Sequence, residues 1–194
     1  VVGPAQEFVA DLGDKLKEFA PDVVVDPAYG RGVSTITRTR QVAGDYLPFR
    51  THLDLRFWEG EGDPWEAPAF FIRVEAERLT IGAGIVEFGP VSSSAFREAI
   101  LDPVESEALT LALAAVEDSG PYEVGGRGSE SKGSALPGEM KHANLLRSDG
   151  VYAAVSGPVP GNFYTKRFID YCLAHFKNLL PLHTWLVDVM NRAQ

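Results

Sequence analysis

The amino-acid sequence predicts a single α+β domain, in which a largely antiparallel sheet of about five strands is flanked by N- and C-terminal helices. Strand-like segments follow one another through short connections in the first half of the chain. Apolar residues recur at helical spacing near both ends. The 194 residues contain no stretch that reads as a linker, so we expect one domain over residues 1–194.

The N-terminal half is predicted to hold one helix and most of the sheet. Apolar residues at helical spacing predict a helix over residues 4–20, which Pro21 ends. β-Branched residues and the alternation of apolar with polar side chains predict strands in the segments that follow. The predicted strands cover residues 33–40, 50–57, 69–75 and 79–88.

The C-terminal half is predicted to be mainly helical. Asp102, followed by Pro103 and Glu105, has the pattern of an N-cap, a first-position proline and a capping box. Residues 118–139 are rich in Gly, Ser and Pro and predict a long surface loop. The remaining expected elements are a short helix over 141–147, a strand over 151–155, a helix from 162 that Pro181 breaks, and a last helix that carries Trp185.

Composition excludes several classes of protein. The 27 acidic and 18 basic residues give a net charge of −9, which argues against a surface built to bind nucleic acid or an acidic membrane. The single cysteine excludes a disulfide framework and a cysteine-built zinc site. No membrane-spanning segment or signal peptide is visible, so the expected location is the cytoplasm.

We expect no cofactor, and the four histidines lack the spacing of a metal site. His175 and Cys172 fall on an apolar helical stripe and are predicted to be core residues.

One charge pattern stands out. Between Tyr29 and Trp58 the chain carries five arginines and two acids, although the whole protein is acidic. Arginine is the side chain best suited to a two-point grip on a carboxylate or phosphate. Strand periodicity gathers most of these residues onto two adjacent faces, Arg50, His52, Asp54 and Arg56 on one and Arg38 and Arg40 on the other. An ordinary solvent-facing sheet, with arginines paired to acids such as Glu75 or Glu87, is the open alternative.

Four segments carry a resemblance to a known family. They are RTRQVAGDYLPFRTH over 38–52, FFIRVEAERLTIGAGIVEFGP with FREAI over 70–100, LPG with KHANLLR over 136–147, and the C-terminal stretch over 176–186 that contains LPL and WL. In order and spacing they resemble the domain of unknown function 2461 family, found in bacteria and fungi. Gln41 stands where that family has a second arginine, so the chain resembles a divergent member with a thinned basic site. The resemblance implies no particular activity.

Three functional hypotheses remain open. The first is a non-enzymatic binding or adaptor domain that holds an anionic phosphate or carboxylate group. The second is an enzyme acting on a phosphorylated or carboxylated small molecule, with His52 or Asp45 as general base. The third is a protein-interaction module that uses aromatic residues on exposed loops. Its candidates are Trp58, Trp65 and Phe70, although core packing is the expected role of most of them. The candidate ligand-binding residues are Arg38, Asp45, Arg50, His52, Lys141 and His142.

Overall fold

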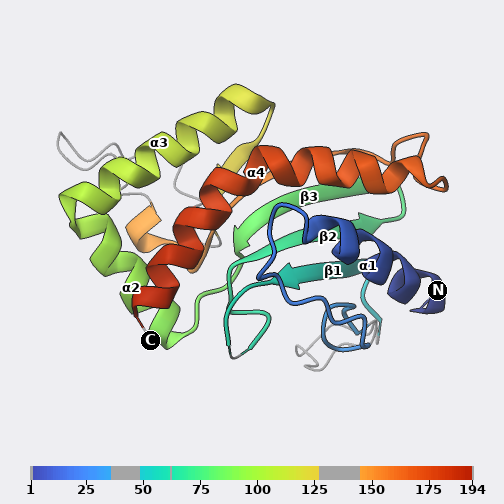
Figure 1. The fold of residues 1–194 in the computed structure, drawn as a ribbon, viewed down its shortest axis with the longest axis horizontal. Coiled ribbons are helices and arrows are strands. Elements are labelled where there is room, and N and C mark those ends of the chain that lie inside the picture. The colour runs from blue at the N-terminus through green and yellow to red at the C-terminus, as the bar shows by residue number, and fades with distance from the viewer. Residues whose placement is uncertain (1, 36–48, 62, 127–144, 194) are drawn as a thin grey trace.

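The computed structural model of the protein describes residues 2–35, 49–61, 63–126 and 145–193. Within these ranges the chain forms one five-stranded antiparallel sheet in the order β1-β2-β3-β5-β4. The predicted α+β class is therefore confirmed, and the sheet is open (Figure 1). The strands are β1 (His52–Trp58), β2 (Ala69–Glu75), β3 (Arg78–Ile85), β4 (Glu123–Gly125) and β5 (Val151–Pro158).

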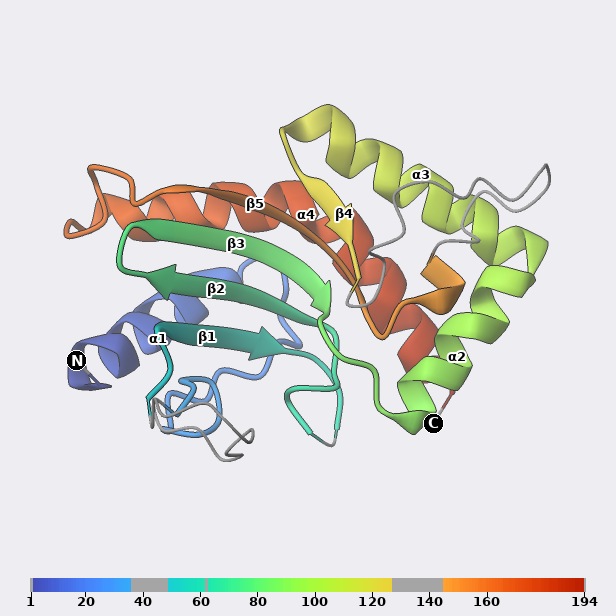
Figure 2. The ribbon, with the colours of Figure 1, turned by 180° about the vertical axis from the view of Figure 1, so that it is seen from behind.

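Within the part of the chain that the structure describes, the helices leave one face of the sheet without a helical layer. Figure 1 shows α1 and α4 in front of the sheet, and Figure 2 shows β1, β2 and β3 from the opposite side, in front of those helices. We call these the inner and the outer face of the sheet. No described helix is both long and apolar enough to cross a membrane. The helices are α1 (Val2–Leu16), α2 (Pro90–Leu101), α3 (Pro103–Ser119), the 3-10 helix η1 (Leu145–Arg147) and α4 (Arg167–Arg192).

The inner face forms the core because alternate strand residues point toward α4. Phe57 of β1 and Phe70 of β2 are fully buried, and both contact Phe176 of α4, with ring centroids 6.0 Å and 4.9 Å apart. Ile72 and Ile81 continue this apolar layer on β2 and β3. The alternation places the polar residues of the same strands on the outer face.

Helix α4 corrects one prediction. Pro181 was expected to separate two helices, yet α4 runs from Arg167 to Arg192 without interruption. A proline inside a helix removes one N–H and bends the helix without ending it when packing holds both halves. Phe176 before the proline and Leu186 after it are both fully buried in the core, and α4 bends along its length (Figure 1).

Two further predictions are corrected in part. The loop expected over residues 118–139 begins later, because α3 continues to Ser119 and β4 forms at Glu123–Gly125; residues 127–139 lie outside the described ranges. The strand expected over residues 33–40 is represented only by isolated bridges at Val33, and residues 36–40 also lie outside the described ranges. Val33 pairs with Leu55, so this segment lies along the free edge of β1.

Several local predictions are confirmed. The Asp102 side chain accepts hydrogen bonds from the backbone N–H groups of Val104 and Glu105 and caps α3. Cys172 is fully buried. His175 is satisfied inside the fold, because its Nδ1 lies 2.7 Å from the hydroxyl of Tyr122.

Candidate functional site

The outer face of β1 and β2 carries a cluster of charged side chains that we call the arginine face. The register places Asp54 opposite Arg73, His52 opposite Glu75, and Arg56 opposite Phe71. Period-two alternation places these residues on the outer face, since their neighbours Leu55 and Ile72 point into the core. The arginine face consists of Arg50, His52, Asp54, Arg56, Arg73 and Glu75.

Asp54 is the buried carboxylate at the centre of the arginine face. It is 6% exposed and accepts two hydrogen bonds from Arg73, at 2.6 Å from Nε and 3.0 Å from Nη2. Donating these hydrogen bonds to Asp54 raises the pKa of Arg73 and keeps its guanidinium charged. The pair therefore has the two-point geometry in which arginine holds a carboxylate.

Arg56 lies next to this pair without a carboxylate of its own. It is 2% exposed, and its Nε and Nη2 have no hydrogen-bond partner among the described residues. Nη1 donates to the backbone oxygen of Trp65 at 3.3 Å, and the guanidinium lies 4.8 Å from the centroid of the Trp65 ring. Burial lowers the pKa of Arg56 to about 10, so the side chain remains charged at neutral pH.

His52 is the titratable group of the arginine face. Its Nε2 lies 3.6 Å from Oδ2 of Asp54, which is an ion-pair distance and too long for a hydrogen bond. Burial lowers the pKa of His52; Asp54 opposes this shift, and Arg73 and Arg50 add to it. His52 is thus placed to gain a proton when a negative charge arrives beside it.

The segment before β1 holds the strand in place from its free edge. The Ser34 hydroxyl accepts a hydrogen bond from the N–H of Asp54, and the N–H of Ser34 donates to the Asp54 carbonyl, both at 2.9 Å. Two residues further along β1, the N–H of Arg56 donates a hydrogen bond to the carbonyl of Gly32. Gly32 is needed there, because a Cβ would lie 2.2 Å from the Asp26 carbonyl oxygen. These contacts fix the backbone positions from which Asp54 and Arg56 project.

The predicted candidates are only partly within the described chain. His52 lies on the arginine face, and Arg50 precedes β1 close enough to lower the pKa of His52. The other four candidates, Arg38, Asp45, Lys141 and His142, lie outside the described residues.

The structure adds Arg56 and Arg73 to the candidate site, although neither was predicted as a ligand-binding residue. Arg56 was placed on the correct face by strand periodicity, but its burial has no signal in the sequence. Arg73 was missed because the register that sets it against Asp54 cannot be read from one strand.

The exposed aromatic residues expected of an interaction module are mostly buried. Trp58 and Phe70 lie in β1 and β2 and are 2% and 0% exposed, so they are buried in the fold, as expected for most of the three candidates. Trp65 is half-buried and lies against Arg56. These aromatic side chains therefore support the sheet and the arginine face.

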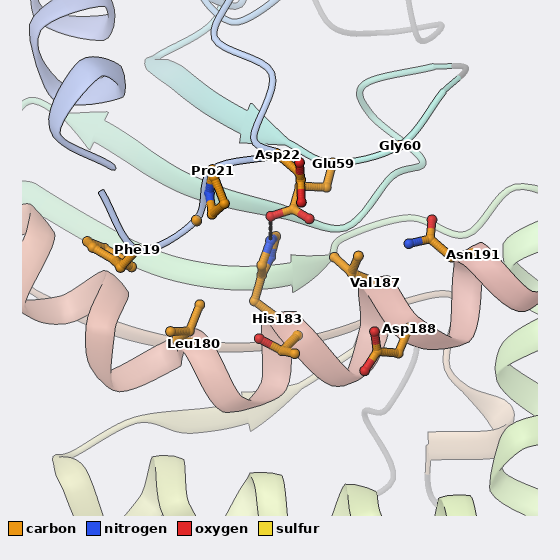
Figure 3. A pocket seen from close by; sticks show the side chains of 12 residues that line it. Phe19, Pro21, Asp22, Glu59, Gly60, Leu180, His183, Val187, Asp188 and Asn191 are labelled. Carbon is orange, nitrogen blue, oxygen red and sulfur yellow. Dashed lines mark hydrogen bonds and ion pairs between the residues drawn. The ribbon is translucent and has the colours of Figure 1, made fainter. Parts of the chain in front are cut away.

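A second polar site lies at the other side of the sheet, beside α4. His183 projects from α4 toward Glu59, which follows β1, and its Nε2 lies 3.0 Å from Oε1 of Glu59 (Figure 3). The pair lines a pocket of about 400 Å³ between α4 and the segment after α1. Sequence reasoning missed this site because its residues lie 124 positions apart.

Over the described residues, no group of three or more His, Cys, Asp and Glu side chains is arranged to hold a metal ion. The arginine face instead presents guanidinium groups, which bind anions.

Comparison with known proteins identifies the family. Among curated proteins the sequence has no match. The family model described as "Conserved hypothetical protein (DUF2461)" matches residues 1–185, which include the arginine face and most of α4. The chain therefore belongs to the DUF2461 family, as the motifs over 38–52, 70–100, 136–147 and 176–186 indicated.

Proposed function

We propose that this protein is a non-enzymatic binding domain that holds an anionic group, a phosphate or a carboxylate, on the arginine face. One observation carries the proposal: two arginines share one buried carboxylate. Asp54 accepts both of its short hydrogen bonds from Arg73, which leaves the charge of Arg56 without a dedicated partner.

The surroundings of Arg56 support this proposal, because nearby carboxylates compensate its charge only in part. The carboxylates that act on Arg56 belong to Asp54 and Asp63. Asp63 is exposed, and its side chain accepts a hydrogen bond from the N–H of Trp65. Water screens an exposed carboxylate, so Asp63 compensates a buried guanidinium only weakly. The fold therefore retains positive charge beneath the outer face of an acidic protein.

The anion is expected to contact the accessible members of the arginine face. The Arg73 side chain is 43% exposed, and Arg50 and His52 are half-buried beside it. Arg56 lies deeper and acts through its charge, which is effective at short range because its buried surroundings screen it weakly. Arg38 and Lys141 remain proposed contributors from outside the described residues.

A thermal-shift screen at low salt tests the proposal. The probes are orthophosphate, nucleotides, sugar phosphates and dicarboxylates, and binding to the native state raises the unfolding midpoint by mass action. We expect a shift for one anion class in the wild type and its loss in Arg50→Ala. Arg97→Ala is the matched control, because Arg97 is exposed on α2, and Figure 2 shows α2 at the opposite end of the sheet from the start of β1. A shift that both variants lose equally, or no shift with any anion, contradicts the proposal.

The second candidate function is an enzyme in which His52 acts as general base. The proximity of His52 to Asp54 favours it, because a carboxylate near an imidazole can orient the ring and stabilise its protonated form. Turnover of a bound anion that disappears in His52→Gln, while binding survives, supports this function. Binding without turnover in the wild type supports the non-enzymatic domain.

A further inference from the structure

The pocket beside α4 combines an apolar wall with carboxylates. The segment after α1 contributes Phe19 and Pro21, and the C-terminal half of α4 contributes Leu180 and Val187 (Figure 3). Its volume of about 400 Å³ falls within the range of small-molecule sites, about 300–1,000 Å³. An elongated apolar group of a few carbon atoms has a surface to pack against.

The charged side chains that line this pocket are all acidic. They are Asp22, Glu59 and Asp188, and no lysine or arginine is among the described residues of the lining. Asp22 and Asp188 are exposed at the mouth, whereas Glu59 lies deeper, with 12% of its side chain exposed. A ligand that enters meets two carboxylates first and a third at the inner end.

His183 adds an independent observation at the inner end of the pocket. It is 1% exposed, its ring stacks on Phe70 at 4.0 Å, and its Nδ1 has no hydrogen-bond partner among the described residues. The carboxylate of Glu59 can only accept, so the bond between them places a proton on Nε2. In the neutral ring Nδ1 is then an acceptor without a donor. The inner end of the pocket therefore combines the carboxylate of Glu59 with a buried imidazole nitrogen that has no partner, and its natural complement is a cationic donor.

We infer that this pocket binds a small organic cation, an ammonium or guanidinium group carried on a short carbon chain. The cationic nitrogen donates to Glu59, and the carbon chain lies against Leu180 and Val187. An ammonium already lies beside one lining residue of the pocket, where Nζ of Lys177 makes a cation–π contact 5.3 Å from the centroid of the Phe19 ring. The site is separate from the arginine face and takes a ligand of opposite charge.

Isothermal titration with agmatine at constant ionic strength tests the inference, because agmatine carries an ammonium and a guanidinium on a four-carbon chain. The wild type is expected to bind, and Glu59→Gln to weaken binding at least about tenfold by removing the inner charge. Glu61→Gln is the matched control, since Glu61 is exposed two residues away and does not line the pocket. It is expected to bind like the wild type.

A second variant keeps the test decisive if Glu59→Gln fails to fold. Val187→Phe fills the pocket and leaves the contact between His183 and Glu59 in place, and it is expected to lose agmatine binding. Arg50→Ala is expected to retain it, which separates this site from the proposed anion site. No binding by the wild type at about 10 mM agmatine, or binding as tight as the wild type's in both Glu59→Gln and Val187→Phe, overturns the inference.

Discussion

The carboxylate of Asp54 accepts hydrogen bonds from Nε and Nη2 of Arg73, directly across the β1–β2 ladder. The contact is nearly buried on the Asp54 side and half open to solvent on the Arg73 side. Arg56 lies close to the same carboxylate. The single negative charge of Asp54 is neutralised by Arg73, so the positive charge of Arg56 is left uncompensated. This imbalance is the physical basis of the proposed anion site.

Asp54→Asn is expected to lower the free energy of unfolding by about 2 kcal/mol. Breaking a buried ion pair costs about 3–5 kcal/mol, and the exposure of the Arg73 side chain reduces this value through solvent screening. The same substitution frees the guanidinium of Arg73 from its ion pair with Asp54. It also removes a negative charge that repels an incoming anion. We therefore expect it to tighten anion binding while it destabilises the fold. Urea unfolding and titration of one anion measure the two effects.

Glu75→Gln is the matched control for Asp54→Asn. Glu75 lies on the same outer face, opposite His52, but is only half-buried. Its loss is expected to change the free energy of unfolding by less than about 0.5 kcal/mol. Equal destabilisation by the two substitutions contradicts the central role of Asp54.

The lowered pKa of His52 predicts two opposite effects of pH. Without ligand, His52 is less easily protonated in the folded state than in the unfolded state, so its contribution to stability is present above pH 6.5 and is lost as the pH falls through the folded pKa. A bound anion favours the protonated ring, so anion affinity rises as the pH falls. His52→Gln is expected to flatten the pH dependence of anion affinity and to lose less stability at acidic pH. Anion affinity that falls from pH 8 to pH 6 in the wild type argues against His52 as part of the site.

Gly82 permits the close packing of the outer face beside the arginine face. A Cβ at this position would lie 2.3 Å from Cζ of Phe71 and 2.9 Å from the carbonyl oxygen of Ala153. Gly82→Ala is therefore expected to lower the free energy of unfolding by about 1–3 kcal/mol through overpacking. Gly157→Ala, in β5 and with nothing within 4 Å of its Cβ position, is the control and is expected to cost less. Thermal or urea unfolding of both variants measures the difference, and an equal loss of stability in the two contradicts the overpacking expected at Gly82.

The sequence predicts strands and caps better than it predicts helix continuity. The alternation over 50–57 and the cap at Asp102 depend on local geometry, and both are confirmed in β1 and α3. Pro181 was read as a helix break because local propensity opposes a proline there. The buried contacts of Phe176 and Leu186 override that propensity, and they depend on a sheet that is distant in the sequence.

In the candidate site, too, local features are predicted from the sequence and contacts between distant segments are not. Period-two spacing correctly placed His52, Asp54 and Arg56 on one face of β1. The pairing of Asp54 with Arg73 depends on strand register, and the burial of Arg56 depends on how the segment that contains Trp65 folds over it. The contact between His183 and Glu59 joins two segments far apart in the sequence, so no local sequence pattern predicts it.

The most direct test of the central claim is to compare wild type with Arg56→Met in thermal unfolding while phosphate rises at constant ionic strength. Methionine fills a similar space and needs no hydrogen bonds, so the ligand-free variant is expected to be as stable as the wild type or more stable by about 1 kcal/mol. The wild-type midpoint is expected to rise with phosphate, and that of Arg56→Met to rise far less. A variant that is strongly destabilised yet gains as much from phosphate as the wild type would contradict the claim that Arg56 carries the unpaired charge of an anion site.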